Sequence, residues 1–316
     1  ENNMAGETAT VKHTTSSTLF APEQVAEIFN KVSGHSAIAG LSGQTPIPFA
    51  GVESYIFSMD GEASIVAEGG QKPAGDAAFS KVTVKPLKIV YQHRLTDEFM
   101  NMAEEIALPY LQQFYDGFAK KAARALDIMA FKGLNPASKA AATDTIGTNY
   151  FDSKVTQEVA YDASNVDDNI DTAVSTILGN DGTVTGIAIS PAVAADLGKI
   201  KEKTGSKLPM YPEFRFGGKP AAFGGMKLDI NNTVSFGAST DKSAENTVGY
   251  IGDFEHAMKW GYTQDVKTEI IEYGDPDGQG DLKRTNEIVL RAEAYIGWGI
   301  IDPSSFVRLV KTNPAS

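Results

Sequence analysis

The stretch EGGQKPAGDAAFSKVTV, residues 68–84, lies between two segments that have the pattern of β-strands. One is VESYIFSMDG at 52–61, and the other is VTVKPLKIVYQHRL at 82–95. In the first, the aromatic Tyr55 and Phe57 alternate with smaller side chains, and in the second Val82 and Val84 alternate with Thr83 and Lys85. Such alternation is expected of a strand with two different faces. An isolated two-stranded hairpin is marginally stable in water. The sequence therefore predicts a long hairpin arm that either lies on its own domain or is completed by something outside the chain.

The tip of this arm is predicted to be flexible, because it contains Gly61, Gly69, Gly70, Pro73 and Gly75. Glycine beside lysine also occurs in phosphate-binding loops. Those loops need Gly-Lys followed by Ser or Thr at the start of a helix, which EGGQKP does not provide. We interpret the stretch as a hairpin tip.

Length and composition place the chain among ordinary globular proteins. It has 316 residues, 42% hydrophobic and 22% charged, enough for two domains. No cysteine is present, which excludes disulfides, thiolate catalysis and cysteine-based metal sites. No apolar run approaches the roughly 20 residues that span a bilayer, so no membrane partner is expected. The formal net charge of −12 disfavours tight contact with DNA.

The first third of the chain contains an extended arm and a long helix. Residues 1–21 are polar and without periodicity, and a short helix is expected from Pro22 to Gly34. The chain begins at Glu1 without a signal-peptide pattern, and a start at a residue other than methionine fits either proteolytic processing or a sequence that has been trimmed. Apolar residues at spacings of three and four predict a helix over 108–132, about 35 Å long at 1.5 Å per residue.

A second compact region follows a loop-like stretch at 133–161. Helices are expected at 166–178 and 191–203, and strands at 186–190, 226–231 and 247–254. This alternation predicts a small α/β domain. Three further strands, at 266–273, 286–298 and 305–310, are expected to return to the base of the hairpin.

The candidate chemical sites are weak. The turn DPDGQGD (275–281) offers Asp275, Asp277 and Asp281 as calcium ligands, but the twelfth position is Asn286 rather than Glu. A polar hairpin turn explains the same residues. The four histidines (His13, His35, His93 and His256) have no metal-ligand spacing, and no nucleophile motif is present. We therefore expect neither an enzyme nor a cofactor or metal site.

One aromatic and basic stretch, YPEFRFGG at 211–218, has side chains that could stack on nucleic-acid bases. We considered the stretch to lack a surrounding basic run, and the chain is acidic as a whole. An exposed loop that contacts another protein chain is the favoured interpretation.

The order of the predicted parts resembles the major capsid protein of tailed bacteriophages, which has the HK97-type fold shared with encapsulin shells. Three stretches carry the resemblance. They are IVAEGGQKPAGDAAFSKVTVKPLKI (65–89) for the extended loop, DIMAFKGLNP (127–136) for the end of the long helix, and NEIVLRAEAYIGWGIIDPSSFVRL (286–309) for the last strands.

The resemblance implies an α+β fold with the family's parts in order. Residues 1–33 would be the N-terminal arm, and 34–161 the first part of the peripheral domain, including the extended loop at 55–90 and the spine helix at 104–132. Residues 162–255 would be the axial domain, and 256–316 the return strands of the peripheral domain. Contacts between subunits would come from the extended loop (Gly69, Gly70, Lys72, Phe79 and Lys81), and an axial loop would contain Tyr211, Phe214, Arg215 and Phe216.

The implied function is a structural shell. The chain would assemble as pentamers and hexamers of an icosahedral capsid that encloses double-stranded DNA without reading its sequence. Assembly would take place in the bacterial host cytoplasm, with a decoration protein, a scaffold and a portal as further partners. The alternative on the same fold is an encapsulin-type compartment that holds a cargo enzyme.

Some members of the family cross-link their subunits covalently through a Lys–Asn isopeptide bond, whose formation is assisted by a buried Glu. The analogues here would be Lys81, or Lys72, and Asn286. Alignment of the strand IVLRAEAY places Thr285 at the acceptor position and Ala292 where the Glu belongs. We therefore expect no cross-link, and a shell held by non-covalent contacts.

Overall fold

A computed structural model describes residues 35–60, 63–72, 74–100, 104–203, 205–237, 245–263 and 267–312. The predicted N-terminal arm and its helix after Pro22 lie outside the described residues. The α-helices are α2 (Ala37–Leu41), α3 (Asp97–Met100), α4 (Glu104–Lys132), α5 (Thr143–Ile146), α6 (Phe151–Lys154), α7 (Val166–Leu178), α8 (Pro191–Leu197) and α9 (Leu282–Thr285), with short 3-10 turns η1 (Pro212–Gly217) and η2 (Pro303–Ser305).

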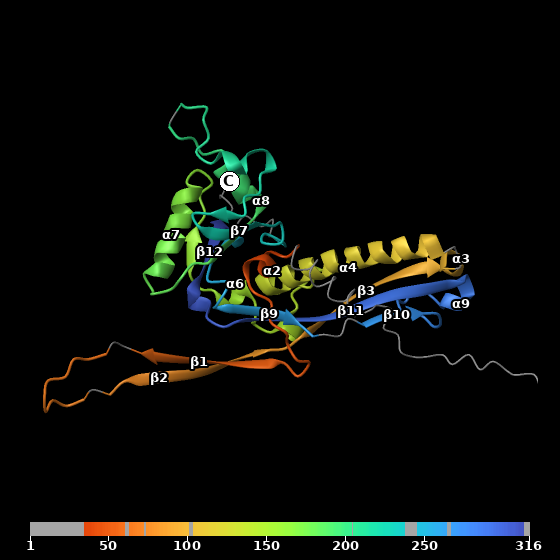
Figure 1. Ribbon diagram of the computed structural model, residues 1–316, viewed down its shortest axis with the longest axis horizontal. Helices are drawn as coiled ribbons and strands as arrows, with labels where there is room; N and C mark the ends of the chain where they lie inside the picture. Colours follow the sequence, from red (N-terminus) through yellow and green to blue (C-terminus); the bar gives the residue numbers. More distant parts are fainter. Residues whose placement is uncertain are drawn as a thin grey trace, which may run out of the picture.

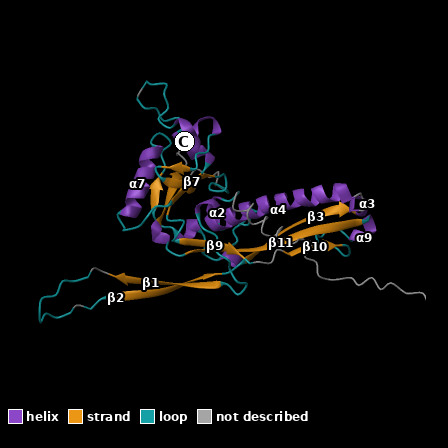
Figure 2. Ribbon diagram, in the orientation of Figure 1, coloured by secondary structure: helices purple, strands orange, loops and turns teal. Residues whose placement is uncertain are grey.

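The strands form three sheets (Figures 1 and 2). A two-stranded hairpin contains β1 (Val52–Asp60) and β2 (Asp76–Val84). A four-stranded sheet contains β3 (Leu87–Thr96), β9 (Met258–Tyr262), β10 (Lys267–Ile271) and β11 (Glu287–Ile300). A six-stranded sheet has the order β4 (Glu158–Ala160), β12 (Phe306–Thr312), β8 (Glu245–Gly252), β5 (Gly186–Ile189), β7 (Met226–Ile230) and β6 (Ala222–Phe223).

Helix α4 is the longest element and matches the predicted spine helix at both ends. Its 29 residues span about 43 Å at 1.5 Å per residue. The spacing of Phe118, Ala122, Leu126 and Met129 places them on one buried stripe, which faces the core shared with β11. Gly133 ends the helix at φ +64°, and its N–H donates to Met129 O at 2.9 Å. Figure 1 shows α4 lying along β3 and β11.

Strand β11 is the centre of the four-stranded sheet. It pairs antiparallel with β3 on one side, and with β10 and β9 in succession on the other. The predicted inward face, Ile288, Leu290, Ala292, Ala294, Ile296 and Trp298, is buried throughout. Trp298 donates its indole N–H to Asn149 O at 2.7 Å, so the one polar atom of this side chain is satisfied.

The six-stranded sheet carries α7 and α8, which contact each other. Its core includes Val166, Ile170 and Ile177 from α7, packed with Ile187 and Leu309 from the strands. We expected the last strand among the return strands, but β12 pairs antiparallel with β8 and parallel with β4. Hydrogen bonds therefore cross the boundary drawn at 255, and the division into peripheral and axial domains stays a prediction.

A buried polar network joins the end of α4 to this sheet. Lys132 Nζ lies 3.0 Å from Asp152 Oδ2, and the Tyr250 hydroxyl donates to Asp152 Oδ1 at 2.7 Å. Thr247 donates to the same oxygen at 2.8 Å, and Arg308 pairs with Asp152 at 3.5 Å. Both oxygens of this partly buried carboxylate are thus used, and the Lys132 ammonium, only 8% exposed, has a counter-charge.

Several predictions about secondary structure were wrong in detail. The stretch at 133–161, expected to be loop-like, contains α5, α6 and β4. The segment at 82–95 is not one strand, because the chain leaves the hairpin at Val84 and starts β3 at Leu87 after Lys85 and Pro86. Proline lacks the N–H that a ladder needs, so the break falls there. Helix α8 ends at Leu197 rather than at 203, and β9 was not predicted.

Candidate assembly surfaces

The β1–β2 hairpin extends away from the rest of the described molecule (Figure 1). Its register is regular, from Val52 opposite Val84 to Asp60 opposite Asp76. At the base, Val84 is buried, and its side chain lies against Gly299 of β11. Beyond this anchor the ribbon is two strands wide, and among the described residues no third strand pairs with either edge.

One face of the hairpin is aromatic. Phe57 and Phe79 are directly opposite each other, and Tyr55 lies two residues along on the same face. The rings of Tyr55 and Phe79 stack with centroids 5.4 Å apart and an interplanar angle of 18°. Phe79 is nevertheless 68% exposed, and Tyr55 and Phe57 are similarly open to solvent. Three exposed aromatic side chains on one ribbon indicate a surface for another chain.

Lys81 lies at the edge of this aromatic face. Its ammonium donates to Glu53 at 2.7 Å, and the Tyr55 hydroxyl donates to the other Glu53 oxygen at 2.9 Å. The hydrogen bond with Glu53 raises the pKa of Lys81, while the Lys81 and Tyr55 donors lower the pKa of Glu53. Isopeptide formation needs a neutral amine, and this pairing favours the ammonium.

The tip of the hairpin is fully open in the described residues 63–72. Gly69 has φ +76°, a conformation that glycine adopts at no steric cost, and the Gly70 N–H closes the turn onto Ala67 O at 2.9 Å. Lys72 is exposed, and Ile65 projects completely into solvent. The predicted loop residues thus divide, with Gly69, Gly70 and Lys72 in the tip, and Phe79 and Lys81 on strand β2.

Asn286, the candidate acceptor, is at the opposite end of the molecule, between α9 and β11 (Figure 1). It has φ +52° and ends α9, and its carbonyl accepts the Asp97 N–H at 2.9 Å. The position aligned with the assisting Glu is Ala292, which is fully buried and has no carboxylate. The expected absence of a cross-link stays a prediction, and these contacts support it.

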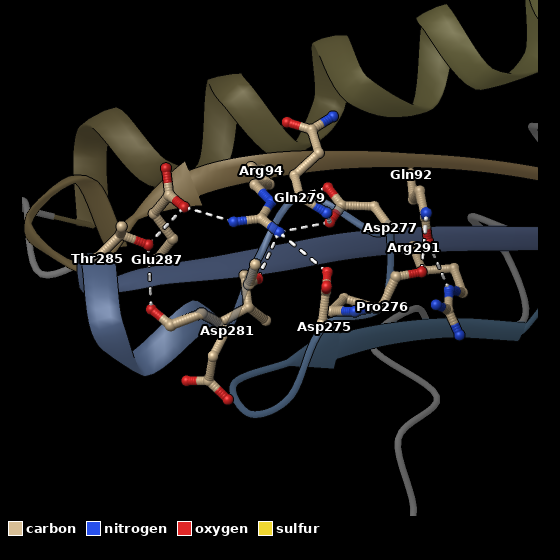
Figure 3. A network of polar contacts seen from close by, with 12 residues as sticks. Gln92, Arg94, Asp275, Pro276, Asp277, Gln279, Asp281, Thr285, Glu287 and Arg291 are labelled. Carbon is tan, nitrogen blue, oxygen red and sulfur yellow. Dashed lines mark hydrogen bonds and ion pairs between the residues drawn. The ribbon is translucent and has the colours of Figure 1, made fainter.

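The DPDGQGD turn is organised around arginine. Figure 3 shows Arg94, on β3, between Asp277 and Glu287. Arg94 Nε donates to Asp277 Oδ2 at 2.7 Å, and Nη1 donates to Glu287 at 2.7 Å. Asp281 instead caps α9 by accepting the Lys283 N–H at 2.9 Å. The carboxylates of the calcium hypothesis are therefore used by the protein itself. Over the residues that the structure describes, no group of three or more His, Cys, Asp or Glu could hold a metal ion.

The four predicted axial residues divide between core and surface. Phe214 is buried, and Tyr211 packs its ring on Phe223 with centroids 5.4 Å apart while its hydroxyl donates to Asp167 at 3.3 Å. Phe216 is 100% exposed at φ +56°, and the Arg215 guanidinium lies 5.3 Å from its ring centroid. Arg215 and Phe216 are thus the pair available for contact.

The surroundings of this pair are basic, and our interpretation that no basic run surrounds it was wrong. Residues 199–219 contain six basic side chains and two acidic ones. The net charge of the whole chain hides this local excess.

No described helix is both long and apolar enough to cross a membrane.

Comparison with known proteins places these features in a family. The profile of the phage capsid family matches residues 17–311. A solved structure from Mycobacterium phage Ogopogo matches with a TM-score of 0.73 at 28% identity, covering 88% of this chain and 92% of that one. One from Gordonia phage Cozz matches with a TM-score of 0.69 at 23% identity, covering 89% and 87%. None of the curated proteins matches.

A more distant structure shares the fold alone. Described as the capsid of a native GTA particle computed with C5 symmetry, it has a TM-score of 0.61 at 12% identity and covers 89% of this chain and 90% of that one. The HK97-type fold expected from the order of the parts is confirmed. The chain therefore belongs to the phage capsid family.

Proposed function

We propose that this capsid protein assembles into pentamers and hexamers, and that these build an icosahedral shell around double-stranded DNA. The observation that carries the proposal is the β1–β2 hairpin, whose aromatic face is exposed and whose strands pair with no third strand among the described residues. Extended backbone laid against another chain gains hydrogen bonds that a lone ribbon lacks. A head-to-tail contact that repeats around an axis closes into a ring.

Two further observations support this assembly. The GTA capsid of the same fold was computed with C5 symmetry, so rings of five are compatible with this architecture. The net charge of −12 keeps enclosed DNA from adhering to the shell. We place assembly in the bacterial host cytoplasm, where a scaffold, a portal and a decoration protein would be partners.

The test compares the wild-type protein with two variants at Phe79, which is exposed and does not hold the fold. Phe79→Asp places a charge in the aromatic face, and Phe79→Tyr is the matched control. Sedimentation velocity is expected to show wild type and Phe79→Tyr as megadalton particles or discrete rings. Phe79→Asp is expected to remain at the 33.7 kDa of the single chain with an unchanged Tm. A wild-type protein that stays at 33.7 kDa at high concentration and raised salt would contradict the proposal.

The contents of the shell are a separate question. Particles purified from phage-producing cells and treated with nuclease are expected to release protected double-stranded DNA after disruption. Particles that contain a cargo protein and no DNA would instead identify an encapsulin-type shell.

A further inference from the structure

The six-stranded sheet carries two segments of opposite charge. The first, which we call the basic loop, is residues 199–219, with a net charge of +4 from six basic and two acidic side chains. The second, which we call the acidic segment, is residues 162–181, which contain five aspartates and no basic residue. In a chain whose formal net charge is −12, a local excess of positive charge stands out.

The basic loop projects from the sheet between α8 and β7, at the top of Figure 1. A bridge between Lys201 and Pro209 closes its base. Lys199 is paired with Asp196 at 2.5 Å. Beyond that pair, Lys201, Lys203 and Lys207 are exposed, and they form no ion pair with any described residue. The positive charge of these three lysines is therefore not compensated by an ion pair among the described residues.

The same loop also exposes large apolar side chains. Leu208 is 63% exposed, Met210 is 49% exposed, and Phe216 is completely open to solvent. Single exposed apolar residues are ordinary, but Leu208 lies within the bridge that closes the loop and Met210 directly beyond it, so both add apolar surface beside the lysines. Cations beside apolar residues fit a partner with carboxylates around a small apolar contact.

Helix α7 has such a surface. Its buried stripe contains Val166, Ile170, Ala173 and Ile177, which turns the intervening positions outward. Asp168 and Asp171 are exposed there and form no ion pair with any described residue, and Leu178 is exposed at the end of the helix. The outward face of α7 therefore combines free carboxylates with an exposed leucine.

We propose that the basic loop of one subunit docks on the outward face of α7 of the next copy. The proposal rests on the proposed function, because it names one contact within the ring. A head-to-tail interface joins unlike faces of identical subunits, so a chain that carries both charges can supply both sides. Complementary charge at such an interface speeds encounter and fixes the register.

Without this contact, the lysine-rich loops of neighbouring subunits would face one another. Lysine-rich loops brought close together around a ring axis would repel one another within the screening length of about 8 Å at physiological salt. Unlike charges from the adjacent subunit remove that repulsion without any other molecule. Leu208 and Met210 would then pack near Leu178, which is exposed in the single chain.

The experiment exchanges the charges of the two surfaces in the full-length chain. One variant carries Lys201→Glu, Lys203→Glu and Lys207→Glu, a second carries Asp168→Lys and Asp171→Lys, and a third combines both sets. Lys120→Glu with Lys121→Glu, on the exposed side of α4, is the matched control. Particle yield is measured by sedimentation at low and at raised salt, with and without nuclease.

Each one-sided reversal is expected to lower the particle yield about tenfold or more at low salt, because like charges then face each other. The combined variant is expected to restore the yield, and the α4 control to leave it unchanged. Because Asp168 lies in the first turn of α7, the Tm of each variant is measured, and Asp171→Lys alone is a second test that spares the helix start.

The outcomes separate the two proposals. A wild type that never assembles defeats the proposed function itself. Wild-type particles together with normal assembly of both one-sided variants overturn the docking contact and leave the function standing. A combined variant that does not recover also overturns it. Wild-type assembly that is lost on nuclease treatment would show that nucleic acid, rather than a direct contact between copies, holds the particles together, which overturns the contact as well.

Discussion

Asp127, near the C-terminal end of helix α4, accepts the backbone N–H of Ala37 at 3.0 Å. The same carboxylate accepts the Ile38 N–H at 3.2 Å, the Thr233 hydroxyl at 2.8 Å and the Ser36 hydroxyl. It thus fastens the start of α2, the first described helix, to the long helix and to the loop after β7. Asp127 is completely buried, and this burial outweighs the four donors and raises its pKa to about 6.

The raised pKa predicts an unusual pH dependence. The folded protein takes up a proton at Asp127 below about pH 6, whereas the unfolded chain does so near its ordinary value of 3.8. The contribution of this group to stability therefore rises as the pH falls from about 6 to about 4, by about 2 kcal/mol.

Urea unfolding of the unassembled Phe79→Asp protein, with and without Asp127→Asn, measures this contribution. Other carboxylates titrate alike in both proteins and cancel in the difference. The free energy of unfolding of the protein with Asp127 is expected to increase relative to the Asn variant on acidification. A difference that does not change with pH would show that Asp127 keeps an ordinary pKa.

The buried pair of Lys132 and Asp152 predicts a large effect of removing one partner. Asp152→Ala leaves the Lys132 ammonium buried without its counter-charge and frees the Tyr250 and Thr247 hydroxyls. The loss is expected to be about 3–5 kcal/mol of unfolding free energy. Asp144→Ala, at an exposed position in α5, is the control and is expected to cost little. A loss for Asp152→Ala below about 1 kcal/mol would mean that the network adapts.

Arg94 predicts the behaviour of the turn at 275–281. Hydrogen bonds from the Arg94 guanidinium lower the pKa of Asp277 to about 2. The ionised carboxylate therefore stabilises the fold at pH values above the ordinary pKa of 3.8, and this contribution is lost as the pH falls toward 2. Lysine cannot reproduce the paired geometry, so Arg94→Lys is expected to loosen the turn.

The measurement is limited proteolysis with an enzyme that cuts before aspartate. Cleavage at Asp275 or Asp277 is expected to be faster in Arg94→Lys than in wild type. Arg124→Lys is the control, because Arg124 contacts Asn232 and the Phe236 ring rather than the turn or its neighbours. Equal cleavage rates in all three proteins would show that Arg94 does not hold the turn.

Substitution of glycine by alanine is expected to have opposite effects on stability at Gly261 and at Gly117. A Cβ at Gly261, in β9, would collide with the carbonyl oxygen of Thr45. Thr45 is held in place there, because its N–H donates to Trp260 O at 2.9 Å. Gly261→Ala is therefore expected to destabilise the fold by at least about 2 kcal/mol. Gly117 lies in α4 with open space around it, and Gly117→Ala is expected to stabilise by about 0.5–1 kcal/mol. Thermal unfolding of both variants against wild type decides the signs.

Much of the fold could be predicted because its long elements have clear periodicity. Helix α7 begins and ends at the predicted residues, and α4 ends where Gly133 stops it. Strand β9 (MKWGY) was missed because five residues with a glycine carry little pattern, and its identity depends on pairing with β11. The sequence also did not predict which sheet contains β12, because its partners β4 and β8 are distant in the chain and leave no local signal.

The assembly surfaces were predictable in position but not in detail. The hairpin followed from its alternation and its glycines, whereas the pairing of Lys81 with Glu53 depends on the register of two strands 28 residues apart. Asp127 did leave a signal that we did not use, because it interrupts the apolar run RALDIMAF. A lone carboxylate on the buried face of a helix indicates a partner that only the fold can supply.

The break at Lys85 and Pro86 has a mechanical consequence. Among the described residues, the ladder of β1 and β2 is not continued into either of the other sheets, and it meets the body at Val84 beside Gly299. Swinging the arm about this pivot leaves every pair from Val52–Val84 to Asp60–Asp76 intact. We therefore expect the arm to change its angle as one unit, which would let one sequence contact neighbouring subunits at several angles without breaking the ladder.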